Sequence, residues 1–298
     1  MTPPWQSALL ESGLRAATAV ARAEGLPADD PRVLSARGNL VVHLAPAPVV
    51  ARVATLTART RRDPVAWLRR ELLVAGHAAH RGAPVIAPTP LVDPGPHTAG
   101  EHPVTLWTFH DVTPGRPDPD VAGAALAALH DACADLPGPL ARLTPVHDQI
   151  DDTLAAIRDR ALLPPATIDA LHRRHAAVLA DLPAPSDADV VLHGDAHAGN
   201  LVLADGHWRW TDFEEACRGP VAWDLAVLAG TDRGAEPGQR ALAAYAAASG
   251  TPVPGDAALA PFAAARRLEA AVWLVAMADV DPDRYARLAA ERLAEILA

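Results

Sequence analysis

The sequence contains no lysine, and it has few aromatic residues. All 26 basic residues are arginine, and Phe, Trp and Tyr together make up 4% of the 298 residues. Abundant Ala, Pro, Gly and Arg beside scarce Asn, Ile, Phe and Tyr are typical of a GC-rich coding sequence, so we attribute the missing lysine to mutational bias. Half of the residues are apolar, and alanine, leucine and valine must therefore form most of the core.

Cysteines and long apolar runs are also scarce. Cys133 and Cys217 lack the paired spacing of a metal site, so we expect both to be small buried residues in a reducing compartment. No apolar run reaches the ~18 residues of a membrane span, and Glu11, Arg15 and Arg22 interrupt the N-terminal segment. The sequence predicts a cytoplasmic protein without an export signal or a membrane span.

Charge excludes one class of partner. There are 36 acidic residues against 26 basic ones, a formal net charge of −10 that is spread along the chain. No basic stripe offsets this field, which argues against nucleic-acid binding. The field would attract a cationic small molecule, although many acidic proteins have no such ligand. Both a monomer and a homodimer are compatible with the sequence.

The stretch from 190 to 212 combines strand-like runs with polar side chains. An apolar run ends in a His-Gly-Asp sequence whose last residue is Asp195, and Asn200 follows five residues later. Two further strand-like runs, joined by an Asp-Gly turn that favours hairpins, lead to Asp212. We expect this strand, loop and hairpin to bring Asp195, Asn200 and Asp212 together.

Phosphoryl transfer needs these three side chains. A carboxylate must orient or deprotonate the acceptor hydroxyl, and oxygen ligands must hold Mg²⁺ against the nucleotide phosphates. Asp195 suits the first task, and Asn200 and Asp212 suit the second. We place His193 beside Asp195 in the catalytic group, as the residue that orders the loop through hydrogen bonds.

This stretch resembles the catalytic segment of the aminoglycoside phosphotransferase and choline kinase family. The family pattern is His-Gly-Asp, an Asn five residues later and an Asp-Phe pair after a hairpin; here the pair is Asp212-Phe213, followed by Glu214 where protein kinases have Gly. The resemblance implies an α+β, protein-kinase-like bilobal fold, with a β-rich N-terminal lobe (1–108) and a mainly α-helical C-terminal lobe (109–298).

The resemblance also implies an activity. The enzyme would transfer the γ-phosphoryl group of ATP or GTP, with Mg²⁺, to a hydroxyl of a small molecule. Aminoglycoside-like antibiotics, amino sugars and amino alcohols are the implied acceptors. The sequence does not distinguish antibiotic resistance from biosynthesis or salvage. Glu269 and Trp273 share a helix face that could line an acceptor pocket or pack into the core.

The residues before the first strands are candidates for phosphate binding. We expect strands at 40–44 and 49–53, preceded by a polar loop from Ser35 to Asn39. The resemblance implies that backbone amides of Ser35, Gly38 and Asn39 cover the ATP phosphates. Gly38 is the single glycine of this loop, so the sequence does not distinguish a phosphate-binding loop from an ordinary surface turn.

Arg52 occupies the strand position where the family resemblance implies a phosphate-bridging lysine. Such a lysine pairs with a Glu on the next helix. Asp63 as N-cap, Pro64 at the first position and Gly82 beyond the end predict that helix, and Glu71 lies on it. We predict an Arg52–Glu71 pair, with a wider planar head than lysine would give. The alternative is that both side chains are solvated.

The resemblance implies a hinge at 109–111 after a last strand at 104–109. Backbone groups of Phe109 and His110 would face the adenine. The resemblance further implies that Asp224 supports the catalytic loop by hydrogen bonds, although an acidic residue at a helix N-terminus is stabilising in any case. His130 is expected to be a packed or capping histidine.

Two other functions remain open. The alternation of His193, Asp195 and His197 also suits a zinc- or manganese-dependent hydrolase, which would need further ligands. A catalytically weak nucleotide-binding relative would explain Arg52 and the glycine-poor loop.

Overall fold

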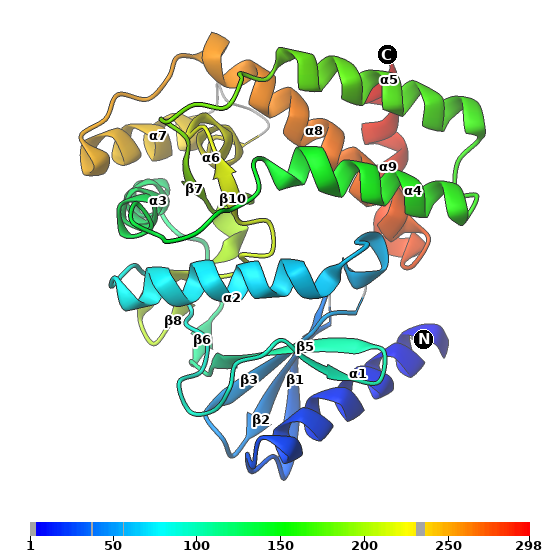
Figure 1. Cartoon of the computed structure of the whole chain (residues 1–298), viewed down its shortest axis with the longest axis vertical. Coiled ribbons are helices and arrows are strands. Elements are labelled where there is room, and N and C mark those ends of the chain that lie inside the picture. Colours follow the sequence, from blue (N-terminus) through cyan, green and yellow to red (C-terminus); the bar gives the residue numbers. More distant parts are fainter. Residues whose placement is uncertain (1–3, 37, 56, 231–235) are drawn as a thin grey trace.

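The structure is a computed structural model that describes residues 4–36, 38–55, 57–230 and 236–298. Its N-terminal part holds a five-stranded sheet flanked by two helices, and its C-terminal part is mainly helical (Figure 1). The predicted α+β fold, β-rich at the N-terminus and helical at the C-terminus, is confirmed. Among the described residues, no helix is both long and apolar enough to cross a membrane.

The sheet is antiparallel, with strand order β1-β2-β3-β5-β4. The strands are β1 (Asp30–Ala36), β2 (Leu40–Ala45), β3 (Val49–Val53), β4 (His97–Ala99) and β5 (His102–Thr108). The prediction that a loop begins at Ser35 is wrong, because Ser35 lies in β1 and pairs with Val41. This edge strand is largely exposed and lacks the alternation of apolar residues that marks a half-buried strand.

The two faces of the sheet have different partners. Directly paired residues point to the same face of an antiparallel sheet. Val42 and Ala51 are paired and belong to a buried cluster with Ala17 of α1 (Pro4–Ala23), which covers one face of the sheet (Figure 1). Arg52 has the opposite orientation, so it points away from α1 and toward the rest of the molecule.

Helix α2 (Pro64–His80) lies between the sheet and the C-terminal helices (Figure 1). The predicted cap is confirmed: the Asp63 side chain accepts a 3.0 Å hydrogen bond from the amide of Ala66, with Pro64 at the first position. Glu71 is on the buried face of this helix, between the buried residues Leu68 and Leu72. The apolar face of α2 thus places one carboxylate inside the protein.

The C-terminal part packs helices around two small sheets. The helices are α3 (Pro119–Ala132), α4 (Ile150–Asp159), α5 (Pro165–Asp181), α6 (Ala222–Leu228), α7 (Glu236–Ser249), α8 (Asp256–Ala278) and α9 (Pro282–Leu297). The strands are β6 (Val112–Thr113), β7 (Val190–Leu192), β8 (Leu201–Ala204), β9 (His207–Trp210) and β10 (Cys217–Gly219), in the orders β6-β8-β9 and β10-β7. The predicted strand at 190–192 and the hairpin after Asn200 are confirmed. Both cysteines are free and buried, as expected.

Candidate active site

The loop from His193 to Asn200 leaves β7 through a glycine that no other residue can replace without strain. Gly194 has φ +88°, and a Cβ atom there would lie 2.0 Å from the carbonyl oxygen of Glu215. The tight approach turns the chain at once, so the next side chain, Asp195, lines a cavity of about 290 Å³ together with Asp212.

Asn200 and Asp212 present oxygen atoms of the kind that Mg²⁺ binds. The Asn200 Nδ2 donates to the carbonyl oxygen of Asp195 at 2.9 Å, which leaves its Oδ1 for another partner. The backbone of Asn200 also accepts a 2.9 Å hydrogen bond from the amide of Thr211, which ties the loop to the residue before Asp212. Asp212 itself has φ +66°, an uncommon conformation for a residue other than glycine and one that recurs at functional sites.

This donor set fits Mg²⁺ bound together with a nucleotide. Within the described ranges, no group of three or more His, Cys, Asp or Glu side chains is arranged to hold a metal ion. Mg²⁺ commonly takes one or two protein ligands and completes its shell with phosphate oxygens and water. One carboxylate and one carboxamide suit that mode, whereas an all-protein metal centre needs more ligands.

Arg52 joins three carboxylates with one guanidinium. Its Nη1 is 2.6 Å from Glu71, and its Nη2 is 2.7 Å from Asp212 and 2.5 Å from Glu214. The Arg52 side chain is 11% exposed and that of Glu71 is 1% exposed. The predicted Arg52–Glu71 pair is present, and the alternative of two solvated charges is wrong.

The charges in this network shift the pKa values in opposite directions. Burial raises the pKa of Glu71 to about 8 against the attraction of Arg52. Burial would also raise the pKa of Glu214, but the guanidinium groups of Arg52 and Arg61 outweigh it and lower that pKa to about 2. Glu214 is therefore ionised at neutral pH and is the main counter-charge of the two arginines.

Glu214 has a further partner in the loop that was expected to cover phosphates. The Asn39 Nδ2 donates to Glu214 Oε1 at 2.6 Å, and the Asn39 Oδ1 accepts from the amide of Thr55 at 3.4 Å. The Asn39 side chain thus links the first strands to Glu214. The sequence singled out Glu214 only as a departure from the protein-kinase pattern, and it gave no signal for Arg61.

Arg266 on α8 is a site residue that the sequence did not reveal. Its Nη2 lies 2.5 Å from Oδ1 of Asp195, while its Nη1 lies 2.5 Å from Glu269 and 3.3 Å from Glu215. Burial alone would raise the pKa of Asp195, but the charges of Arg266 and His197 lower it below its ordinary value. Asp195 is therefore ionised at neutral pH and able to accept a hydrogen bond.

Two buried carboxylates lie behind this arginine. Gln149 ends a π-helical turn, a feature often found at functional sites, and its Nε2 donates to Glu215 at 3.0 Å and to Glu269 at 2.5 Å. Burial and their mutual repulsion raise the pKa of Glu215 well above its ordinary value, and burial also raises that of Glu269. We call the 290 Å³ space the acidic cavity because carboxylates from five residues line it: Asp195, Asp212, Glu214, Glu215 and Glu269.

Trp273 also lines the acidic cavity, as does Glu269 one turn away on the same helix. Trp273 is also partly buried against the hydrophobic core, so this helix face both lines a cavity and packs; that the cavity holds an acceptor stays a prediction. The Trp273 ring packs edge-on against Tyr285 of α9, with ring centroids 5.7 Å apart.

His193 and Asp224 hold the loop from behind. Asp224 accepts hydrogen bonds from the amides of His193 (2.7 Å) and Gly194 (3.0 Å). The His193 ring is fully buried: its Nε2 donates to the carbonyl of Thr211 and its Nδ1 accepts from the amide of Asp195. Burial lowers the pKa of His193, in keeping with a neutral ring.

Asp224 is itself held by a buried chain of side chains. Both ring nitrogens of His130, on α3, are hydrogen-bonded. Its Nε2 lies 3.0 Å from the carboxylate of Asp224, and its Nδ1 lies 3.0 Å from the hydroxyl of Tyr245 on α7. His130 was expected to be packed, and it is buried. Its connection to Asp224 could not be read from the sequence, because the two residues are 94 positions apart.

In the part of the chain that the structure describes, the hydrolase alternative has no metal site. Both ring nitrogens of His193 are hydrogen-bonded within the protein. The Nδ1 of His197 accepts a hydrogen bond from the amide of Gly199, and its Nε2 lies 3.5 Å from Asp195. As stated above, the described residues hold no cluster of metal-binding side chains. The His193, Asp195 and His197 alternation therefore orders a loop.

The expected hinge offers fewer backbone groups than predicted. The Phe109 amide donates to the carbonyl of Pro48 at 3.0 Å, and its ring stacks on His43 with centroids 3.6 Å apart. His110 contacts Asp205 at 2.6 Å through its Nδ1. The Phe109 amide is thus already hydrogen-bonded. The backbone groups that we still expect to face the adenine are the carbonyl of Phe109 and those of His110.

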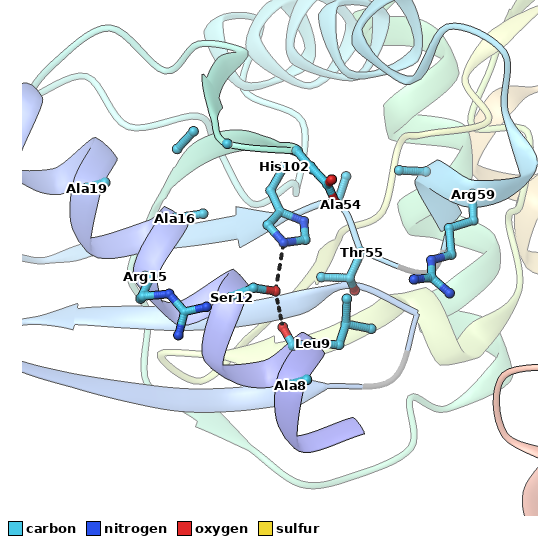
Figure 2. A pocket seen from close by; sticks show the side chains of 14 residues that line it. Ala8, Leu9, Ser12, Arg15, Ala16, Ala19, Ala54, Thr55, Arg59 and His102 are labelled. Carbon is cyan, nitrogen blue, oxygen red and sulfur yellow. Dashed lines mark hydrogen bonds between the residues drawn. The ribbon is translucent and has the colours of Figure 1, made fainter. Parts of the chain in front are cut away.

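A larger cavity, of about 840 Å³, lies elsewhere, between α1 and the turn that joins β4 to β5 (Figure 2). There Ser12 donates to the carbonyl of Leu9 at 3.1 Å and lies 2.9 Å from Nε2 of His102. None of the candidate site residues named from the sequence is among the described residues that line this cavity.

Comparison with known proteins identifies the family. Residues 32–262, more than half of the chain, match the model of the phosphotransferase enzyme family. The chain therefore belongs to that family. A methylthioribose kinase of Cronobacter sakazakii is 33% identical over 82 residues, a match that covers 28% of this chain and only 18% of that enzyme.

Solved structures share the fold at low sequence identity. A choline/ethanolamine kinase family protein from Mesorhizobium loti superposes with a TM-score of 0.62 at 19% identity, covering 97% of this chain and 93% of that one. An amicoumacin kinase, solved with AMP-PNP, Ca²⁺ and Ami, gives a TM-score of 0.66 at 14% identity, covering 94% and 92%. These likenesses confirm the protein-kinase-like fold.

Proposed function

We propose that the protein transfers the γ-phosphoryl group of ATP or GTP, with Mg²⁺, to a hydroxyl of a small molecule. The observation that carries the proposal is the cavity shared by Asp195 and Asp212, with Asn200 bonded to the backbone of Asp195. An acceptor hydroxyl at Asp195 and a nucleotide at Asp212 would lie side by side. The structural relative solved with AMP-PNP supports a nucleotide as the donor.

Each residue has a defined task in this scheme. The ionised Asp195 accepts a hydrogen bond from the acceptor hydroxyl and orients its oxygen toward the γ-phosphorus. The new P–O bond forms as the bond to the departing ADP oxygen breaks, and the hydroxyl proton passes to Asp195. Bound Mg²⁺, held by Asn200 and Asp212, would neutralise the phosphate charge. Glu71 fixes Arg52 where it can reach the phosphates.

Other residues position these groups. His193 and Asp224 hold the backbone of the 193–200 loop. The Gly38 backbone and the free backbone groups at His110 are proposed to contact the phosphates and the base. Asn39 acts indirectly, through the hydrogen bond from its side chain to Glu214, and Ser35, which lies in β1, is assigned no contact with the nucleotide.

An amine-bearing acceptor is favoured. Five carboxylates line the acidic cavity against the guanidinium groups of Arg61 and Arg266, and Trp273 offers an aromatic face. Amino sugars, amino alcohols and aminoglycoside-like antibiotics all carry an ammonium group beside a hydroxyl. The relatives described above, a choline/ethanolamine kinase family protein and a methylthioribose kinase, support a small hydroxylated acceptor.

Phosphorus NMR of the full-length protein with ATP or GTP, Mg²⁺ and a panel of amino sugars and amino alcohols tests this function. The proposal predicts a new phosphate monoester and ADP or GDP in equal amounts, only when an acceptor and Mg²⁺ are both present. Metal-dependent hydrolysis of esters without nucleotide would contradict it and favour the hydrolase. Nucleotide binding without transfer to any alcohol would favour the weak relative.

A further inference from the structure

A second cavity adjoins the acidic cavity and has the opposite charge. This space of about 180 Å³ shares Asp195, His197 and Arg266 with the acidic cavity. Its other charged lining residues are Arg267 of α8 and Arg292 of α9, and Asp195 is the one carboxylate among its described lining residues. We call it the basic cavity. The two cavities meet at the carboxylate that is proposed to hold the acceptor hydroxyl.

The arginines of the basic cavity differ in how far their charge is already used. Arg266 is committed to Asp195, Glu215 and Glu269, as described above. Arg267 makes no ion pair or side-chain hydrogen bond with any described residue. Arg292 pairs with Glu295, three residues along the same helix, at 2.7 Å in a half-exposed position where such pairs contribute little. The basic cavity therefore has guanidinium charge available for a ligand.

A carboxylate is the ligand that fits this arrangement. Guanidinium groups bind carboxylates through paired, charge-assisted hydrogen bonds. A volume of 180 Å³ holds a carboxylate and its neighbouring carbons, since one water takes about 30 Å³ of liquid volume. Arg267 and Arg292 come from two different helices, so a ligand between them would be held from two directions.

We propose that the acceptor is a hydroxylated amino acid. This inference rests on the proposed function and narrows its acceptor. The hydroxyl lies at Asp195, the ammonium group lies on the side of the acidic cavity, and the carboxylate lies in the basic cavity on Arg267 and Arg292. An amino alcohol without a carboxylate would leave the second cavity unused, and a carboxylic acid without an amine would leave the first.

Matched pairs of product-like compounds test the carboxylate site without any need for turnover. O-phosphoserine and phosphoethanolamine differ by one carboxylate, as do O-phosphohomoserine and 3-aminopropyl phosphate. Calorimetric titration of the full-length protein with Mg²⁺ and ADP present measures each affinity. We expect the carboxylate compound of at least one pair to bind about tenfold or more tightly, the effect of a hydrogen-bonded charge worth about 1.5–3 kcal/mol.

Variants then assign that difference to the two arginines. Arg267→Gln and Arg292→Gln should each reduce the preference for the carboxylate compound by about tenfold and leave the affinity for its partner compound unchanged. Arg287→Gln is the matched control, because Arg287 is an exposed arginine of the same helix as Arg292 and pairs with Glu291. It should change neither affinity.

Three results would overturn the inference: equal affinity within both pairs, no binding of either compound, or a carboxylate preference that survives both substitutions. These failures differ from failure of the proposed function. If amino alcohols accept phosphate from ATP while the carboxylate has no effect, only the amino-acid acceptor is wrong. If no alcohol accepts phosphate and nucleotide turnover is independent of Asp195, the proposed function is wrong.

Discussion

Arg52 and Glu214 both differ from the residues of the protein-kinase pattern, and they contact each other. One residue replaces the usual lysine and the other replaces the usual glycine after Asp-Phe. In the structure the planar guanidinium of Arg52 uses one nitrogen for Glu71 and the other for Asp212 and Glu214. A lysine ammonium is a single point and does not span the same three carboxylates.

Arg52→Lys should consequently destabilise the protein although it conserves the charge. We expect a loss of about 1–3 kcal/mol in the free energy of unfolding, because at least one buried carboxylate loses its hydrogen bond. Urea denaturation measures this loss. Arg32→Lys, at an exposed pair with Asp30, is the control and should change stability by less than about 0.5 kcal/mol. Equal effects of the two substitutions would contradict the role given to the guanidinium of Arg52.

Glu215 gives a prediction for pH. Its pKa is raised in the folded protein, so between its ordinary value near 4.5 and the raised value the folded state holds a proton that the unfolded chain has lost. Stability must then fall as pH rises through this window. Glu214 contributes nothing there, since with a pKa of about 2 it affects stability only as pH falls toward that value.

Glu215→Gln should remove this loss. We expect the variant to melt at a higher temperature than the wild type at pH 8 and at the same temperature near pH 4. Each unit by which folding raises the pKa of Glu215 corresponds to about 1.4 kcal/mol in the free energy of unfolding. Melting curves measured across this pH range check the prediction. Parallel pH profiles of variant and wild type would show that Glu215 ionises normally.

At the scale of elements, the 193–200 loop depends on hydrogen bonds from side chains of three helices, α3, α6 and α7. Asp224 of α6 binds two loop amides, and His130 of α3 and Tyr245 of α7 continue the chain of hydrogen bonds. Helices α3 and α7 pack closely, since a Cβ on Gly123 would lie 2.1 Å from the carbonyl of Ala241. The loop geometry is therefore set by the core of the helical part.

His130→Ala should lower kcat more than it raises KM for ATP. Asp224 would keep its two backbone donors but lose its side-chain partner, so the loop would be less well oriented while the nucleotide contacts stay in place. A loss of about tenfold in kcat corresponds to the 1–3 kcal/mol of a buried polar group left without its partner. Tyr245→Phe, which removes only the distal hydroxyl, should have a smaller effect. Steady-state kinetics of the two variants measure these effects. An unchanged kcat of His130→Ala would exclude a role of His130 in positioning the loop.

The sequence predicted some elements and site residues better than others. The hairpin after Asn200 and the cap of α2 rest on local signals, an Asp-Gly turn and an Asp-Pro start, and both were correct. The edge strand at Ser35 and the three-residue strand β10 carry no alternation of apolar residues, so local patterns could not indicate them. Arg266 was missed because its importance comes from tertiary contact with Asp195, 71 positions away.

At the scale of the whole molecule, two parts meet at the site. We propose that the lobes divide between Thr108 and Phe109, at 1–108 and 109–298. Strand β5 ends at Thr108, whereas the next strand, β6, already pairs with β8 of the helical part. Arg52 reaches across this division to Asp212 and Glu214. A nucleotide bound between the lobes would add to the same contacts.

Binding of the nucleotide should therefore stabilise the whole protein in a metal-dependent way. With MgATP at about 100 times its dissociation constant, we expect a gain of about 2.7 kcal/mol in unfolding free energy. Chelation of Mg²⁺ with EDTA should remove most of this gain, and Asp212→Asn should reduce it. Thermal melting with ATP, with MgATP and with EDTA provides the comparison. A gain of the same size with and without the metal would contradict the role of Asn200 and Asp212.

The most direct test of the central claim, that Asp195 orients a hydroxyl beside a nucleotide held at Asp212, is single-turnover phosphoryl transfer by wild type and Asp195→Asn. Asparagine keeps the shape of the side chain but removes the charge that accepts the proton. The account predicts a rate at least ~100-fold lower, with the affinity for MgATP within about threefold of the wild type. Transfer at the wild-type rate by the asparagine variant would contradict it.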